Sequence, residues 1–144
     1  MKTQDIFYLG MYDNMIKGGQ TYDARKRWGR SQYNQGGGYQ LPNYLYFANP
    51  AVQFPIDKLA MFYESHYYNF LKHQRGNFRK KLEFIDPRHT HITIENVRDT
   101  IENYIRKNNL MVLRLKSEFI DIIPYTPSFC RDVREDYEKY CEPV

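Results

Sequence analysis

The sequence predicts a single α+β domain in which a small, mostly antiparallel β-sheet is flanked by helices. Three patterns predict this class: an early run of β-branched and aromatic residues that ends in a two-residue turn, two stretches with apolar residues at three- and four-residue steps, and a late alternating stretch. The chain has 144 residues and is 42% hydrophobic, which suits one domain with its own core. Fourteen Tyr and nine Phe make much of that core aromatic.

The predicted strands come mainly from the first half of the chain. Residues Ile6 to Tyr12 form a β-branched and aromatic run, which is typical of a strand. Asp13-Asn14 is a turn signal, and Met15 to Lys17 begins a second short strand, so the pair is predicted to form a hairpin. Tyr44 to Phe47 is predicted as a third strand, and Lys81 to Ile85 as a short edge strand.

Two amphipathic helices are predicted from the spacing of apolar residues. Asp57 is the expected N-cap of the first helix, which runs to about His73, and Thr93 is the expected cap of the second. The first apolar stripe comprises Leu59, Phe62, Tyr63, Tyr67, Phe70 and Leu71, and the second comprises Ile94, Val97, Ile101, Tyr104 and Ile105. Because each stripe follows the helical repeat, each helix is expected to pack on one side.

The last part of the chain is predicted as an extension of this domain. Residues 111–115 alternate between apolar and more polar side chains, which favours a late strand. A short charged helix is expected from Ser128. We therefore divide the chain into a main domain, residues 1–109, and a C-terminal strand and helix, residues 110–144, packed on the same domain.

Charge and composition bound the partners. The net charge is +4 and the pI about 9.0, which is compatible with a polyanionic partner. No run approaches the roughly 18 apolar residues that a membrane span needs, and the start has no signal-peptide layout, so we expect an intracellular protein with no membrane partner. Cys130 and Cys141 match no metal spacing and are interpreted as reduced thiols.

The most informative stretch runs from Lys17 to Trp28. A strand end is followed by two glycines, a short polar turn and then a predicted helix that begins at Asp23. Backbone N–H groups near a helix start, with arginines beside them, make a good phosphate site. The basic residues concerned are Arg25, Lys26, Arg27 and Arg30. The alternative is an exposed basic helix that follows a glycine turn.

The order of these segments resembles that of the GIY-YIG nuclease family. The first motif matches Ile6-Phe7-Tyr8, and the second matches Lys17-Gly18-Gly19, similar to the Lys-x-Gly variant of a viral and phage branch. The helical arginine of the family matches Arg27, and its metal-binding glutamate matches Glu64 on the helix predicted from Asp57.

The resemblance covers roughly residues 5 to 107. Beyond Glu64, Gly76-Asn77-Phe78 and Leu82-Glu83-Phe84 are similar to the short closing strand of many members. The second tyrosine of the family is missing here, and Gly18 stands where an aliphatic residue is usual.

This resemblance implies a Mg²⁺-dependent (or Mn²⁺-dependent) DNA endonuclease. Tyr8 would be the general base, Arg27 and Lys17 would bind the phosphate, and Glu64 would bind the metal. One carboxylate with retained waters suits Mg²⁺, and the planar fork of an arginine suits a phosphate. An ordinary tyrosine titrates near pH 10, so Tyr8 would need a nearby cation. The further nucleic-acid contacts implied are Arg25, Lys26, Arg30 and Asn77.

Two other functions remain open on the sequence. The chain could be a GIY-YIG-like module that binds nucleic acid or protein without cutting, or a small interaction protein whose motifs match by accident. His89 and His91 would share one side of a strand, but no third ligand is evident, so a solvated pair is favoured over a zinc site. Aromatic surface residues would allow a homodimer.

Overall fold

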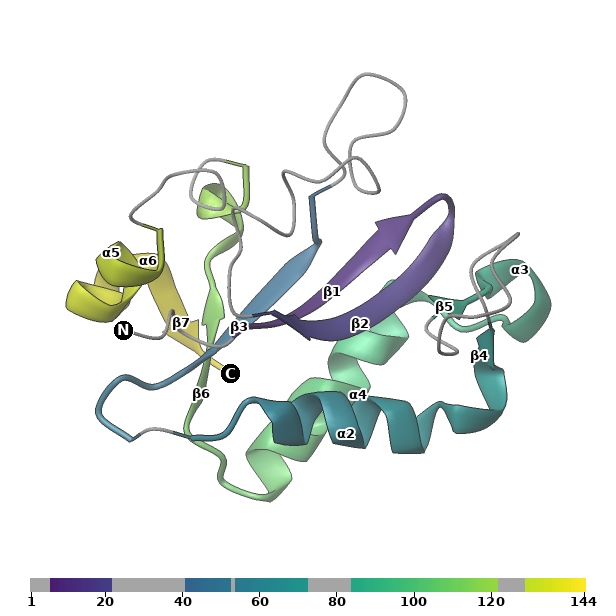
Figure 1. Cartoon of the computed structure of the whole chain (residues 1–144), viewed down its shortest axis with the longest axis horizontal. Coiled ribbons are helices and arrows are strands. Elements are labelled where there is room, and N and C mark those ends of the chain that lie inside the picture. Colours follow the sequence, from purple (N-terminus) through teal and green to yellow (C-terminus); the bar gives the residue numbers. More distant parts are fainter. Residues whose placement is uncertain (1–5, 22–40, 53, 73–83, 122–128) are drawn as a thin grey trace.

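The computed structural model describes residues 6–21, 41–52, 54–72, 84–121 and 129–144. In these residues seven strands form one sheet in the order β4-β5-β2-β1-β3-β6-β7, and every neighbouring pair is antiparallel. Helices flank the sheet (Figure 1). The predicted α+β class, with an antiparallel sheet and flanking helices, is therefore confirmed.

The hairpin at the centre of the sheet matches the prediction at its turn and differs in its second strand. β1 (Ile6–Tyr12) and β2 (Met15–Thr21) are joined by Asp13 and Asn14, whose φ angles of 53° and 63° suit a tight hairpin turn. β2 was predicted only to Lys17, because glycines usually interrupt strands. It continues to Thr21, since its residues remain paired with β1 as far as Ile6.

The strands on one side of the hairpin come from distant parts of the chain. β3 (Tyr44–Ala48) pairs with β1, β6 (Val112–Leu115) pairs with β3, and β7 (Cys141–Pro143) pairs with β6. β3 and β6 were predicted within one residue or so, whereas β7 was not, because three residues ending in proline carry no strand pattern. Both strands of the C-terminal extension thus belong to the same sheet as the hairpin.

On the other side of the hairpin the prediction of an edge strand is wrong. β5 (Phe84–Ile85) pairs with Ile16 and Lys17 of β2 on one side and with β4 (Leu71–Lys72) on the other. β5 is therefore an interior strand. The rest of the predicted segment, residues 81–83, lies outside the described residues.

Helix α2 (Asp57–His66) is shorter than predicted. Asp57 is its first helical residue and Ile56 is the N-cap, so the predicted cap at Asp57 is wrong by one position. After His66 the chain makes a short 3₁₀ turn, η3 (Tyr68–Phe70), and then enters β4. The apolar spacing continues past His66, but pairing of Leu71 with β5 ends the helix before the predicted His73.

Helix α4 (Ile94–Lys107) is confirmed together with its cap. The Thr93 side chain accepts a hydrogen bond from the Asn96 backbone, and the Asn96 side chain accepts one from the Thr93 backbone. This capping box satisfies two of the backbone N–H groups at the helix start. The predicted apolar positions Val97, Ile101 and Ile105 are buried.

Short helices complete the described chain. They are α3 (Pro87–Thr90), η4 (Ser117–Phe119), α5 (Phe129–Glu135) and α6 (Tyr137–Tyr140). The charged helix predicted from Ser128 is thus two short helices separated by Asp136. The predicted His-x-His strand pair is wrong, because His89 lies in α3 and His91 is its left-handed C-cap.

The sheet buries side chains on two faces. The face covered by α2 and α4, called here the helix face, carries Phe7, Leu9, Ile16 and Tyr46. The opposite face, called here the Tyr8 face, carries Ile6, Tyr8, Tyr12, Leu45 and Phe47, and packs with Val133 of α5 and Cys141 of β7. In Figure 1 α2 and α4 lie together under the sheet, and α5 and α6 lie beside β7. No helix among the described residues is long and apolar enough to cross a membrane.

Candidate functional site

Tyr8 and Lys17 lie on the same face of the central hairpin. The register pairs Tyr8 with Gly19 and Gly10 with Lys17, so the two side chains are diagonal neighbours on the Tyr8 face. Both are buried, with exposed fractions of 1% for Tyr8 and 8% for Lys17. The structure therefore brings together two of the four residues that the sequence predicts at the site.

The two glycines of β2 make room for tyrosine rings on opposite faces. A Cβ atom at Gly19 would lie 2.9 Å from the hydroxyl oxygen of Tyr8, and one at Gly18 would lie 3.0 Å from the ring of Tyr63. Distances this short require something to move, so neither position accepts a side chain without rearrangement. The Tyr8 hydroxyl consequently lies over the β2 backbone at Gly19.

This position brings the Tyr8 hydroxyl close to the outer side of β2. β5 pairs only with Ile16 and Lys17 of β2. Within the described ranges, Gly18 to Thr21 pair with β1 on one side and with no strand on the other. The part of β2 from Gly18 to Thr21 is called here the β2 edge.

Glu64 approaches from the opposite face of the sheet. It is an exposed residue of α2, the helix that packs on the helix face against β1 and β2. Its neighbour Phe62 stacks on Tyr104 of α4 at 4.0 Å, and its neighbour Tyr63 faces Gly18. Because each helical residue is rotated by about 100° from the previous one, Glu64 turns away from α4.

The direction in which Glu64 turns is the outer side of β2. α4 packs under β1 and bonds to β3 and β6 through Glu102, whereas α2 packs under β1 and β2. The side of α2 remote from α4 is therefore the side on which β2, β5 and β4 lie. Glu64 does not share a face with Tyr8 and Lys17; it is exposed on the helix that packs on the opposite face.

The remaining predicted site residues lie outside the described part of the chain. These are Arg27 of the predicted catalytic set and Arg25, Lys26, Arg30 and Asn77 of the predicted nucleic-acid contacts. β2 ends at Thr21, so the chain leaves the β2 edge directly into the segment that contains Arg27.

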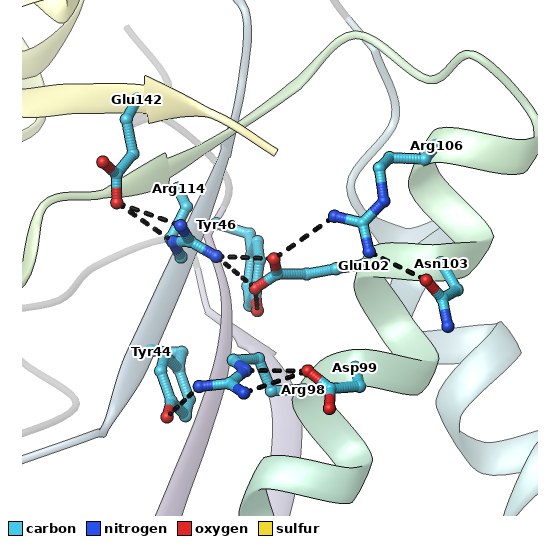
Figure 2. Close-up of polar contacts among 9 residues, drawn as sticks. All are labelled: Tyr44, Tyr46, Arg98, Asp99, Glu102, Asn103, Arg106, Arg114 and Glu142. Atoms are coloured by element: carbon cyan, nitrogen blue, oxygen red, sulfur yellow. Dashed lines mark hydrogen bonds and ion pairs between the residues drawn. The ribbon is translucent and has the colours of Figure 1, made fainter.

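A polar cluster that the sequence did not predict lies between α4 and the strands β3 and β6 (Figure 2). The carboxylate of Glu102, whose side chain is 7% exposed, accepts a hydrogen bond of 2.8 Å from the Tyr46 hydroxyl. Arg114 donates to both carboxylate oxygens of Glu102 and reaches Glu142 of β7 at 3.0 Å. Arg106 lies 3.7 Å from the same carboxylate. These five residues are called here the Glu102 cluster.

Two members of the Glu102 cluster, Tyr46 and Arg114, are surrounded so that their protonated forms are favoured. Burial, together with the Glu102 charge, raises the pKa of Tyr46 far above its usual range, so its hydroxyl remains a donor. Burial opposes the charge on Arg114, but hydrogen bonds to Glu102 and Glu142 raise its pKa above the ordinary value. A charged pair with its partners in place is a structural element rather than a reactive one.

The sequence contains the residues of this cluster, but no local pattern shows that they lie together. Glu102 follows Ile101 on the flank of an apolar stripe, and Arg114 stands between apolar residues in a predicted strand. Only the pairing of β3 with β6, which sets Tyr46 opposite Arg114, brings them together under α4.

Among the described residues, a metal ion would be bound by at most a single carboxylate or a pair of ligands. No group of three His, Cys, Asp or Glu side chains in the described ranges is arranged to hold a metal ion. A single carboxylate such as that of Glu64 is compatible with a magnesium ion that keeps most of its waters. Cys141 is a buried free thiol on the Tyr8 face, and burial raises its pKa to about 12, so it is a poor ligand at neutral pH.

Comparisons with known proteins identify no related protein. No family model matches the sequence, and no curated protein and no solved structure is significantly similar to it. The GIY-YIG resemblance therefore rests on the four motifs and enters below as a proposal.

Proposed function

We propose that this protein is a Mg²⁺-dependent DNA endonuclease whose phosphodiester site lies at the β2 edge. The observation that carries the proposal is the hairpin register, which sets Tyr8 and Lys17 side by side and leaves Gly19 without a side chain beneath the Tyr8 hydroxyl. A proton acceptor on β1 and a cation on β2 are thereby diagonal neighbours on one face of the hairpin.

Each residue has a role that follows from its chemistry. Tyr8 accepts a proton from the attacking water, and the neighbouring Lys17 favours its ionised form. Arg27 holds the phosphate through two donors. Glu64 holds the metal from the other side of the β2 edge. When bound, a magnesium ion supplies charge stabilisation at the phosphate and leaving oxygens.

The distribution of charge along the chain supports a polyanionic substrate. Segment 22–40 contains four basic residues and one acidic residue, and so does segment 73–83. Together they exceed the whole chain's net charge of +4, so the remainder is net negative. Basic residues concentrated in two segments are typical of a nucleic-acid contact rather than of uniform solubility.

Both basic segments join the described chain at β2 or at the strands beside it. The first leaves β2 after Thr21. The second connects Lys72 of β4 to Phe84 of β5, and the register places these two residues level with Lys17 of β2. The described residues from which both segments leave thus belong to β2 or to the strands β5 and β4 beside it.

The decisive experiment is cleavage of plasmid and single-stranded DNA by the purified chain with Mg²⁺ and with EDTA. Cleavage that needs the metal supports the proposal. Glu64→Gln should abolish it and leave DNA affinity and folding unchanged, because only the metal-binding charge is lost. Glu118→Gln, a similarly exposed acidic residue in η4, is the matched control. If Glu64→Gln cuts at the wild-type rate, Glu64 is not the metal ligand.

One observation favours a second candidate function, a nucleic-acid-binding or protein-interaction module that does not cut. Tyr8 is only 1% exposed, and Lys17 only 8%, whereas a general base must reach water. Salt-dependent DNA binding without cleavage at any metal concentration would select this alternative. Failure to bind DNA at low salt would leave a protein partner.

A further inference from the structure

We propose that Tyr68 and Phe70, two exposed aromatic residues of η3, form a platform on which unpaired bases stack, so that the substrate is single-stranded DNA. The pair is called here the η3 platform. This inference rests on the proposed function and names the substrate class of the same site. The platform holds a base next to Glu64 and touches no reacting atom.

The rings of the η3 platform are exposed to solvent. Tyr68 is 67% exposed and Phe70 41%. The other large apolar side chains with comparable exposure in the described part of the chain are not aromatic: Val52, Met61 and Met111. Both exposed rings thus lie in one three-residue turn. A pair of rings in one turn, unlike single scattered apolar residues, indicates a binding surface.

The backbone sets this turn next to Glu64. α2 ends at His66, and its helical path continues toward η3, because the Tyr67 N–H donates to the Tyr63 carbonyl oxygen at 3.0 Å. The rings of Tyr63 and Tyr67 accordingly lie 5.5 Å apart, and both are buried. Glu64 and Tyr68 each follow one member of this buried pair and are exposed. Since residues four apart on a helical path are surface neighbours, Tyr68 lies on the same side of this segment as Glu64.

The surroundings of the two rings fit a nucleobase better than a protein partner. Ser65, His66 and Asn69 are polar, exposed and next to the platform along the chain, so the rings stand among polar side chains. The centre of a protein interface is instead apolar and closely packed. Stacking of a base needs only the face of one ring, because every base has a π-face.

The charge of the chain that follows η3 fits a phosphate backbone. η3 leads through β4 into segment 73–83, which contains four basic residues and one acidic residue. Proteins that bind single strands combine basic residues, which contact phosphates, with aromatic residues, on which bases stack. In a duplex the bases are already paired and stacked on each other, so a ring on a protein surface reaches only unpaired bases. These observations favour single-stranded DNA as the substrate.

Equilibrium binding in EDTA tests the η3 platform without cleavage. The probe is a fluorescently labelled DNA oligonucleotide, either single-stranded or annealed to its complement, and its affinity is measured by anisotropy. Tyr68→Ala should weaken single-strand binding about tenfold, because stacking on one ring is lost, and should leave duplex binding unchanged. Phe70→Ala should weaken it less, since Phe70 is less exposed. Tyr68→Phe keeps the ring and should bind as the wild type does.

Met61→Ala is the matched control for loss of exposed apolar surface. Met61 is 64% exposed and lies on α2, the helix that leads to the platform. A loss of single-strand affinity in Tyr68→Ala alone supports the inference. Wild-type affinity in Tyr68→Ala, an equal loss on the duplex, or an equal loss in Met61→Ala overturns it. If Tyr68→Ala does not fold, Tyr68→Leu removes the ring, keeps an apolar side chain and is judged by the same outcomes.

Cleavage with Mg²⁺ then separates this inference from the proposed function. If the wild type binds single strands through Tyr68 but does not cut them, the nuclease proposal fails and the η3 platform stands. If the wild type cuts, but Tyr68→Ala binds and cuts single strands as the wild type does, only the platform is lost. If the wild type binds no oligonucleotide at low salt, the platform is overturned and the exposed rings are left for a protein partner.

Discussion

The two faces of the central sheet bury charge in opposite ways. On the helix face, the Glu102 carboxylate lies among the Tyr46 hydroxyl and the guanidinium groups of Arg106 and Arg114 (Figure 2). Arg114 also forms an ion pair with Glu142. On the Tyr8 face, the Lys17 ammonium lies 5.5 Å from the centroid of the Phe84 ring, and Lys17 is paired with Gly10 and diagonal to Tyr8 of β1.

The difference indicates what each region does. In the Glu102 cluster, carboxylates offset guanidinium charges and a tyrosine donates a hydrogen bond to the buried carboxylate. These contacts connect α4 with β3, β6 and β7. At Lys17 the ring of Phe84 is a neighbour of the cation. We therefore expect substitutions in the first region to change the free energy of unfolding, and substitutions in the second to change the reaction.

The largest expected effect is on folding. Glu102→Ala should lower the free energy of unfolding by about 3 to 5 kcal/mol, because it leaves Arg114 partly buried without its main counter-charge. Urea denaturation measures this, and Glu95→Ala, an exposed position on the same helix, is the control.

The double variant Glu102→Leu with Arg114→Met sharpens this prediction. Apolar residues of similar volume should restore most of the lost stability, since no buried charge remains unpaired. If the single variant costs less than about 1 kcal/mol, the cluster behaves as a surface pair and the contrast between the faces disappears.

The next effect is on rate. Tyr8→Phe should slow single-turnover cleavage on the order of 10²-fold, because it removes the proton acceptor and keeps the ring. Tyr12→Phe removes a hydroxyl four residues further along the strand on the same face, where Tyr12 is also buried, and should leave the rate unchanged. Equal rates for both variants would remove Tyr8 from the mechanism.

A smaller effect tests how Gly19 shapes the site. Gly19→Ala should cost about 1 to 3 kcal/mol in stability, because its Cβ would lie 2.9 Å from the Tyr8 hydroxyl oxygen. Since that oxygen is the nearest atom, the cost should fall when Tyr8→Phe is also present, which a double-mutant cycle measures. Additive costs would mean that the alanine is opposed by some other neighbour.

The smallest effect appears at high pH. The pKa of Tyr46 is raised by burial and by the Glu102 charge, so its contribution to stability is complete below the unfolded value near 10 and is lost as pH rises above it. Each pH unit above about 10 should cost roughly 1.4 kcal/mol from this residue. Tyr46→Phe should flatten that part of the alkaline unfolding curve, whereas Tyr68→Phe, at an exposed position, should not. Identical curves would place Tyr46 outside the cluster.

Local sequence patterns correctly predicted the elements that have a clear strand, turn or helix-cap signal. The strand Ile6–Tyr12, its turn at Asp13 and Asn14, and the capped helix from Ile94 were predicted at their observed positions. Their signals are local: side-chain shape, positive φ at a tight turn and a cap next to an apolar stripe. The alternation at Leu113 and Leu115 likewise placed β6.

Elements that depend on a distant partner were missed or misplaced. β7 is a strand only because β6 lies beside it, and α2 stops at His66 because Leu71 pairs with β5. β2 continues through Gly18 and Gly19 because the rings of Tyr63 and Tyr8 fill the space that their side chains would occupy. A glycine pair looks like an interruption until these neighbours are known.

The sequence by itself determined the α+β class, the hairpin and the chemistry of the residues on it, because these follow from local preferences. Tertiary structure alone decided which of those residues meet. The register put Tyr8 and Lys17 on one face, the packing of α2 put Glu64 on the helix of the opposite face, and the pairing of β3 with β6 assembled the Glu102 cluster. These contacts join residues that are far apart in the sequence. The free energy of folding that stabilises them comes from burial of apolar side chains and strand pairing across the whole sheet.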